Sequence, residues 1–373
     1  MTKREQFIDY VKNGGSRVIC SPQIGGGAGF NAKMAGKRFC SEATMQDTIA
    51  ICSRYKMLSL FNFGLDPFMH CEKLKWEEDY LIKEENRKES ASHLDTPYGT
   101  MRRHFIEQPI LGGFSDTDAV NGVEDLDMLE YAIDTALAEP DFSCYRAFGQ
   151  NCDQTVKNEG AISVQWSMQP YEMLCYPSTV TTALLPYDDE ARFIGLMDKI
   201  LALDYKILDA LSGSGVDFVF LGGPASEMIS PAYYEKYLVP YSQKVTDYAH
   251  GKGLMIYSHI CSPIEPMLSM GYYNHMGIDL FETLSPQPEG NIISLADAFG
   301  KLEKGMCTRG NVSLSLMING TTDDIRREVL GICEAAMEAG RKHIVAASDY
   351  LLYNVKEENV AAMADAVEEF YQK

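Results

Sequence analysis

The chain has 373 residues, 46% of them hydrophobic and 23% charged, a composition typical of a folded globular protein with a sizeable core. Its 53 acidic residues exceed its 33 basic residues by 20, and so negative a surface argues against nucleic acid and anionic membranes as partners. No apolar run reaches the roughly 18 residues that cross a bilayer. The first residues also lack the apolar stretch of a signal peptide, so we expect a cytoplasmic protein.

Ten cysteines are spread along the chain without a CxxC pair or a dense cluster. In a chain of this length, such a pattern does not indicate a disulfide framework. We therefore expect most of the thiols to be buried core residues, with one or two available to bind a metal ion.

Eight short apolar runs predict strands that are buried on both faces, as the strands of a parallel sheet are. Helical periodicity follows the later runs, over 188–215, 230–253 and 321–343, and Thr321 before two aspartates is typical of a helix N-cap. Alternating strands and helices predict an α/β fold, a (β/α)8 TIM barrel, with a doubly wound sheet as the alternative. The eight runs lie at 17–21, 57–63, 162–166, 216–223, 254–261, 280–285, 306–311 and 343–349.

No repeat, low-complexity tract or linker marks a domain boundary, so residues 1–373 are expected to form a single domain. Residues 72–150 are the least regular part of the chain. Their charged segment at 72–90 is typical of a solvated helix or a strand pair, and residues 96–109 are typical of a hairpin. We interpret 72–150 as an elaboration inserted above the barrel, not as an independent domain.

Reactive side chains gather where the predicted strands end, which is where active sites lie in barrels of this kind. His259 and Cys261 close the 254–261 strand, Glu282 lies in the 280–285 strand, and Asp349 closes the 343–349 strand. His259 and Cys261 are two residues apart, so on an extended strand both side chains point to one face. The pair is either a zinc-binding unit or a packed core thiol beside a hydrogen-bonded core histidine.

Catalytic zinc sites have three protein ligands and one open position, so a third ligand is needed. Chemistry favours the Cys307 thiol, whereas position favours Asp349, because Cys307 comes early in its strand and Asp349 comes at the strand end. We favour Asp349 and keep Cys307 as the alternative. Glu282 is a candidate ligand, a carboxylate that supports a ligand, or a buried ion-pair partner.

Two other motifs are weaker. The Gly-rich segment 22–30 lacks the GxxxxGK[ST] pattern of a phosphate-binding loop, so we interpret it as a loop over the barrel mouth. The absence of GxSxG argues against a serine nucleophile. Four tyrosines at helical spacing are expected to pack against the barrel, namely Tyr233, Tyr234, Tyr237 and Tyr241.

A series of segments resembles the uroporphyrinogen decarboxylase superfamily in order and spacing, from about residue 17 to the C-terminal end. The resemblance is strongest from residue 188 onward, and it implies a (β/α)8 barrel. The segments are FNAKMAGK, TPYGTMRR, GVDFVFLGGPASEMISPAYYEKYLVPY, GLMIYSHIC, GIDLFETL, GMCTRGNVS, GTTDDIRREV and EENVAAMADAV.

Within that superfamily, the chain is more similar to the cobalamin-dependent methyltransferases than to the decarboxylases. A decarboxylase holds a tetrapyrrole with many carboxylates, which calls for arginines, but residues 18–37 contain only two lysines, Lys33 and Lys37, and no arginine. Methylcobamide:coenzyme M methyltransferases carry a His-x-Cys zinc motif and a late cysteine. His259 and Cys261 match that motif, and Asp349 stands where the late cysteine is expected.

The exchange of a thiolate for a carboxylate leaves a harder, stronger Lewis acid, better suited to an ether oxygen than to a thiol. The resemblance therefore implies a zinc enzyme that moves a methyl group from an O-methyl compound, such as an aryl methyl ether, to a Co(I) corrinoid. The chain lacks the DxHxxG cobalamin motif, so the corrinoid is expected on a partner protein. The alternatives are a methylcobamide:thiol methyltransferase that uses Cys307 and a non-catalytic barrel that binds a corrinoid or tetrapyrrole.

Overall fold

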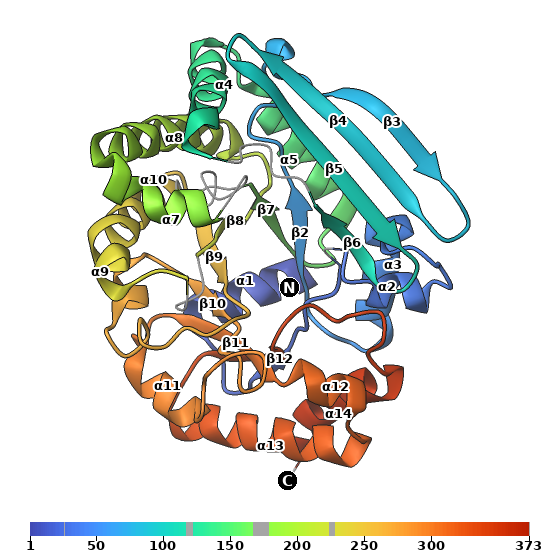
Figure 1. Ribbon diagram of the computed structural model, residues 1–373. Helices are drawn as coiled ribbons and strands as arrows, with labels where there is room; N and C mark the ends of the chain where they lie inside the picture. The colour runs from blue at the N-terminus through green and yellow to red at the C-terminus, as the bar shows by residue number, and fades with distance from the viewer. Residues whose placement is uncertain (26, 117–121, 167–178, 224–227, 373) are drawn as a thin grey trace.

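Eight parallel strands curl into a barrel in the computed structural model, which describes residues 1–25, 27–116, 122–166, 179–223 and 228–372 (Figure 1). The strands follow one another around the sheet in the order β1-β12-β11-β10-β9-β8-β7-β2. A backbone hydrogen bond of 3.3 Å from Leu58 N to Cys20 O joins the two ends of that order. The strands are β1 (Ile19–Cys20), β2 (Leu60–Gly64), β7 (Ala161–Gln165), β8 (Phe218–Leu221), β9 (Met255–His259), β10 (Leu280–Glu282), β11 (Cys307–Val312) and β12 (His343–Ala347).

This topology confirms the predicted TIM barrel, because each of the eight apolar runs contains or overlaps one strand. Strands that are neighbours in the barrel also follow one another along the chain, apart from the inserted sheet and the closure between β1 and β12. A doubly wound sheet instead reverses its strand order partway. The predicted strand over 254–261 is shorter than expected. It ends at His259, so Cys261 lies in the loop that follows.

Helices cover the outside of the barrel, and α13 (Thr322–Glu338) shows how the sequence builds them. Thr321 and Asp324 form a capping box at its start, as the N-cap pattern predicts. Its buried face repeats at intervals of three and four residues, from Ile325 through Val329 to Ile332 and Ala336. The other α-helices are α1 (Lys3–Asn13), α2 (Phe30–Met34), α3 (Met45–Arg54), α4 (Leu126–Ala138), α5 (Ser143–Val156), α7 (Thr179–Asp188), α8 (Glu190–Leu211), α9 (Pro231–Tyr233), α10 (Val239–Gly251), α11 (Leu295–Lys301), α12 (Leu314–Asn319) and α14 (Glu357–Phe370).

Short helical turns complete the shell. The π-helical segment η4 (Tyr234–Leu238) links α9 to α10, and the tyrosines at 233, 234, 237 and 241 are all buried, which confirms their predicted packing role. In the described part of the chain, 3-10 turns lie in the connecting segments η1 (Cys40–Glu42), η2 (Glu72–Leu74), η3 (Val123–Asp125) and η5 (Tyr272–His275). No helix of the described chain is both long and apolar enough to cross a membrane.

An antiparallel sheet is inserted between β2 and α4, where the sequence is least regular. Figure 1 shows it along one side of the barrel, beside α4. Leu94 and Met101 anchor it, because both are buried in the same core cluster as Met128 of α4. Its strands are β3 (Glu77–Lys83), β4 (Lys88–Thr96), β5 (Gly99–Gln108) and β6 (Gly112–Ser115). The 72–90 segment thus contains a strand pair, and the treatment of 72–150 as an elaboration stays a prediction.

The side chains inside the barrel change from apolar at the amino ends of the strands to polar toward their carboxyl ends. Its lower layer is apolar and packs against Phe7, Tyr10 and Val11 of α1, which lie against the amino ends of the strands. The next layer holds Glu282, which is paired in register with His259 on β9 and with Arg309 on β11. The polar side chains therefore lie at the carboxyl ends of the strands, above an apolar floor.

Candidate metal centre

Three side chains from distant parts of the sequence converge at the carboxyl ends of the strands. His259 is the last residue of β9, Cys261 lies two residues further, and Asp349 lies two residues beyond β12. One ligand atom of each lies within 4.8 Å of the other two, and His259 Nε2 is 3.3 Å from Asp349 Oδ1. Among the residues that the structure describes, no other group of three His, Cys, Asp or Glu side chains could hold a metal ion in this way.

Glu282 fixes the orientation of the His259 ring. Its Oε1 is 2.7 Å from His259 Nδ1 and also accepts a hydrogen bond from the Tyr257 hydroxyl. Because Nδ1 faces Glu282, Nε2 faces Cys261 and Asp349. A carboxylate behind the histidine in this way sets the tautomer and the ring orientation of a metal ligand.

A buried ion pair holds Glu282 in place. Arg309 Nη1 is 3.0 Å from Glu282 Oε2, and both side chains are almost completely buried. Burial by itself raises the pKa of Glu282, but the charges of Arg309 and His259 outweigh burial and leave that pKa below its usual value. Glu282 is therefore a carboxylate that supports His259, and it lies outside the group of three.

The site concentrates negative charge around one imidazole. Burial by itself lowers the pKa of His259. Hydrogen bonds to Asp349 and Cys261, and the Glu282 carboxylate, outweigh burial and raise that pKa well above its usual range. The imidazole thus lies among groups that favour a positive charge, which a bound cation also supplies.

The donor atoms of this group fit zinc. Zinc accepts imidazole nitrogen, thiolate sulfur and carboxylate oxygen, and three protein ligands leave a position open for a substrate. His259, Cys261 and Asp349 offer one atom of each kind, all three side chains are half-buried, and the histidine already has its supporting carboxylate. The zinc itself stays a prediction.

Cys307, the alternative third ligand, lies elsewhere. It is completely buried in the lower, apolar layer of the barrel, in the same cluster as Tyr10 of α1. Burial raises the pKa of its thiol to about 12. The structure therefore does not bring Cys307 to the group of three.

We expect the Cys307→Ala variant to keep its zinc and to lose only about 1–2 kcal/mol of unfolding free energy, as for the emptying of a small buried site. Elemental analysis and urea unfolding measure the two quantities. Loss of zinc from this variant, together with retention of zinc by Asp349→Ala, would restore a two-thiolate site.

Sequence reasoning missed several residues around the group of three. Arg309 carried a signal, because an arginine inside an apolar strand run needs a buried partner. Asn62 and Tyr350 carried no signal in the sequence. In the structure, the Asn62 amide donates to the Tyr350 hydroxyl, and the Tyr350 ring centroid is 5.4 Å from that of His259. These contacts depend on how β2, near the start of the sequence, lies against the loop that follows β12.

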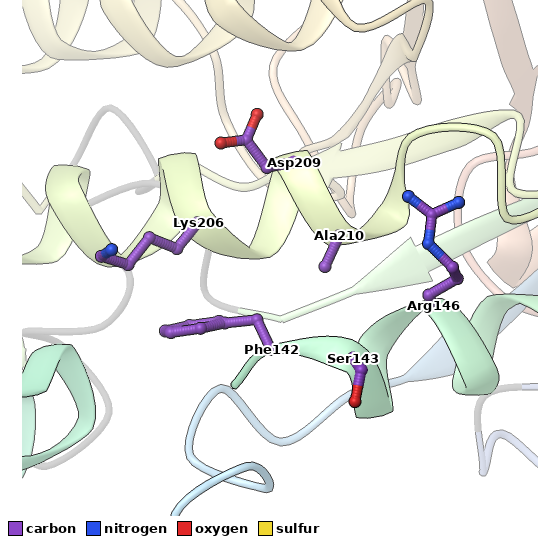
Figure 2. A pocket seen from close by; sticks show the side chains of 6 residues that line it. All are labelled: Phe142, Ser143, Arg146, Lys206, Asp209 and Ala210. Atoms are coloured by element: carbon purple, nitrogen blue, oxygen red, sulfur yellow. The ribbon is translucent and has the colours of Figure 1, made fainter. Parts of the chain in front are cut away.

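A separate hollow lies in the helical shell between α5 and α8, with a volume of about 340 Å³. Figure 2 shows Arg146 on α5 and Lys206 on α8 on opposite sides of it, with the Phe142 ring near Lys206. None of the candidate metal ligands lines it.

Comparison with known proteins identifies the family. The family model "Uroporphyrinogen decarboxylase (URO-D)" matches residues 176–370, just over half of the chain. The uroporphyrinogen decarboxylase of Syntrophotalea carbinolica is 27% identical over 191 residues, which are 50% of this chain and 52% of that protein. The enzyme of the same name from Citrifermentans bemidjiense is 32% identical over 83 residues, 20% of this chain and 24% of that protein. The chain thus spans at most about half the length of these curated relatives.

A solved structure has the same fold over the whole chain. It is described as a methyltransferase from Methanosarcina mazei and superposes with a TM-score of 0.67 at 15% sequence identity, covering 100% of this chain and 99% of that one. At this identity the likeness shows the barrel fold alone. The family match and the barrel lead to one conclusion, that the chain belongs to the uroporphyrinogen decarboxylase (URO-D) family.

Proposed function

We propose that the protein is a zinc-dependent methyltransferase that moves a methyl group from an O-methyl compound to the Co(I) corrinoid of a partner protein. The observation that carries this proposal is the convergence of His259, Cys261 and Asp349 at the carboxyl ends of the barrel strands. The fold shared with a methyltransferase of Methanosarcina mazei is consistent with it.

The charge of the protein supports methyl transfer over decarboxylation. A porphyrinogen carries many carboxylates, and each carboxylate buried without a partner costs several kcal/mol. The net charge is −20, and residues 18–37 contain no arginine to pair with them. A neutral O-methyl compound avoids this cost.

The three ligands determine which chemistry the site favours. Bound zinc supplies a Lewis acid to the ether oxygen, which makes the oxygen a better leaving group. With one thiolate and one carboxylate, Cys261 and Asp349 donate less electron density than two thiolates do, which favours an oxygen substrate over a thiol. The contact between Glu282 and His259 Nδ1 would keep the imidazole ring in one orientation while the methyl ether is cleaved.

The reaction balances with one proton from solvent. The Co(I) electron pair forms the bond to the methyl carbon, the C–O bond breaks, and its electron pair stays on oxygen. The resulting alcohol or phenol oxygen takes a proton from solvent. The corrinoid thus gains the methyl group, and the formal oxidation state of its cobalt rises from I to III.

We expect the protein, with a reduced corrinoid protein and a matching methyl ether, to yield methyl-Co(III), seen as a change in the corrinoid absorption spectrum. A panel of methoxylated compounds identifies the donor. With uroporphyrinogen the protein is expected to release no carbon dioxide. Carbon dioxide release that persists in His259→Ala would contradict the proposal, because the reaction would then proceed without the metal site.

A further inference from the structure

A small hollow lies between the Gly-rich loop and the start of α3, next to the candidate metal centre. Its volume is about 120 Å³. It shares Tyr350 with the surroundings of His259, and Tyr350 directly follows Asp349 in the chain. We call it the loop hollow; its described lining consists of Ile24, Gly25, Gly27, Asn31, Cys40, Ala43, Thr44, Met45, Thr48, Phe61, Asn62 and Tyr350.

The lining of the loop hollow is uncharged. None of the described residues in it is acidic, basic or a histidine, although the chain as a whole carries a net charge of −20. A charged ligand group would lose its water there without gaining a partner of opposite charge, which is costly. The loop hollow therefore suits a neutral group.

One polar group in this lining lacks a partner. The Asn62 amide donates to the Tyr350 hydroxyl through Nδ2, but its Oδ1 is buried and accepts no hydrogen bond from the residues that the structure describes. Two other polar side chains of the lining bond to each other, because Asn31 Nδ2 donates to Thr48 Oγ1 at 3.0 Å. A buried amide oxygen normally has a partner, so Asn62 favours a ligand that brings a hydrogen-bond donor.

The size of the loop hollow limits the ligand further. A cavity of about 150 Å³ holds one benzene molecule. At about 120 Å³, the loop hollow is smaller than that and takes a short aliphatic group rather than a substituted ring.

From these observations we infer that the loop hollow binds the non-reacting end of the methyl donor, and that this end is short, aliphatic and neutral and carries a hydroxyl that donates to Asn62 Oδ1. The inference rests on the proposed function, and it narrows the donor from O-methyl compounds in general to small hydroxylated methyl ethers. Asn62 then acts in substrate choice, apart from the metal ligands.

Four methyl ethers test this inference, and 2-methoxyethanol and methyl propyl ether are the pair that differs in the hydroxyl alone. 2-Methoxyethanol has the hydroxyl, and methyl propyl ether replaces it by a methyl group. Methoxyacetate replaces the hydroxymethyl group by a carboxylate, and anisole replaces the hydroxyethyl group by a ring. We expect 2-methoxyethanol to give the highest kcat/KM for methyl transfer to a Co(I) corrinoid, about tenfold above methyl propyl ether. Equal values for these two ethers would overturn the inference.

The Asn62→Leu variant removes the hydrogen-bonding group, so we expect the tenfold preference to fall to about one while zinc content stays unchanged. Asn62→Ala is a second variant that also removes the amide oxygen, and it should lower the preference in the same way. Lys206→Ala, in the hollow of Figure 2, is the matched control and should keep the preference. A preference that survives both Asn62→Leu and Asn62→Ala would contradict the assigned role of Asn62.

Binding measured by ligand-observed NMR separates this inference from the proposed function. Binding of 2-methoxyethanol that Asn62→Leu abolishes, without methyl transfer in any assay, supports the loop hollow and contradicts the methyltransferase. Methyl transfer with equal use of both ethers supports the methyltransferase and contradicts the loop hollow.

Discussion

The purified protein is expected to carry about one zinc ion per chain, and His259→Ala, Cys261→Ala and Asp349→Ala are each expected to lose most of it. The reason is geometric: one atom of each side chain lies within 4.8 Å of the other two, so removal of one leaves a two-ligand site. Elemental analysis after dialysis against a weak chelator measures the loss.

Conservative variants make this zinc prediction sharper. Asp349→Asn keeps the size of the side chain but removes its charge, so it should bind zinc more weakly than the wild type and more tightly than Asp349→Ala. Circular dichroism checks that each variant is folded. If His259→Ala and Cys261→Ala both retain a full equivalent of zinc, the metal lies elsewhere and the mechanism fails with it.

Arg309→Met is expected to lower the free energy of unfolding by about 3–5 kcal/mol, the cost typical of breaking a buried ion pair from one side. Without Arg309, the Glu282 carboxylate remains at 0% exposure, and of the two cations that lower its pKa only His259 is left. Urea unfolding of the metal-free protein measures this loss, because bound zinc would add its own contribution.

The double variant Glu282→Gln with Arg309→Met is the matched control. Removing both charges avoids the uncompensated carboxylate, so we expect the double variant to be more stable than Arg309→Met alone. If Arg309→Met costs less than about 1 kcal/mol, the ion pair does not hold Glu282 in the folded protein.

The same ion pair predicts a pH dependence. The folded-state pKa of Glu282 lies below the usual value of 4.5. A carboxylate with a lowered pKa contributes stability that is present above its unfolded-state pKa and is lost as the pH falls through its folded-state pKa. The stability difference between wild type and Glu282→Gln should therefore shrink as the pH is lowered below about 4.5.

The barrel could be predicted from sequence because its strands are buried on both faces and therefore appear as apolar runs. The meeting of His259 and Asp349 could be predicted for a related reason, since the carboxyl ends of parallel strands share one end of a barrel. Cys307 comes early in its apolar run, which likewise predicted that its thiol lies too far from the carboxyl ends of the strands to join His259 and Cys261. Its place in the lower barrel layer agrees with that interpretation.

The contacts around the group of three could not be predicted, because they depend on register and loop placement. Glu282 pairs with Arg309 only because β10 and β11 are aligned at those residues. Asn62 meets Tyr350, 288 positions away in sequence, only once the barrel has closed. Periodicity shows which residues are buried, but it does not show which buried residues touch.

Zinc reconstitution during methyl transfer tests the central claim most directly. Metal-free protein, a Co(I) corrinoid protein and 2-methoxyethanol, or the best donor of the methoxylated panel, are mixed while the corrinoid absorption spectrum is recorded. We predict no methyl-Co(III) without zinc, and a rate that rises with added zinc and levels off at about one equivalent per chain. Methyl-Co(III) formed at the full rate by the metal-free protein, or by Asp349→Ala without bound zinc, would contradict the account.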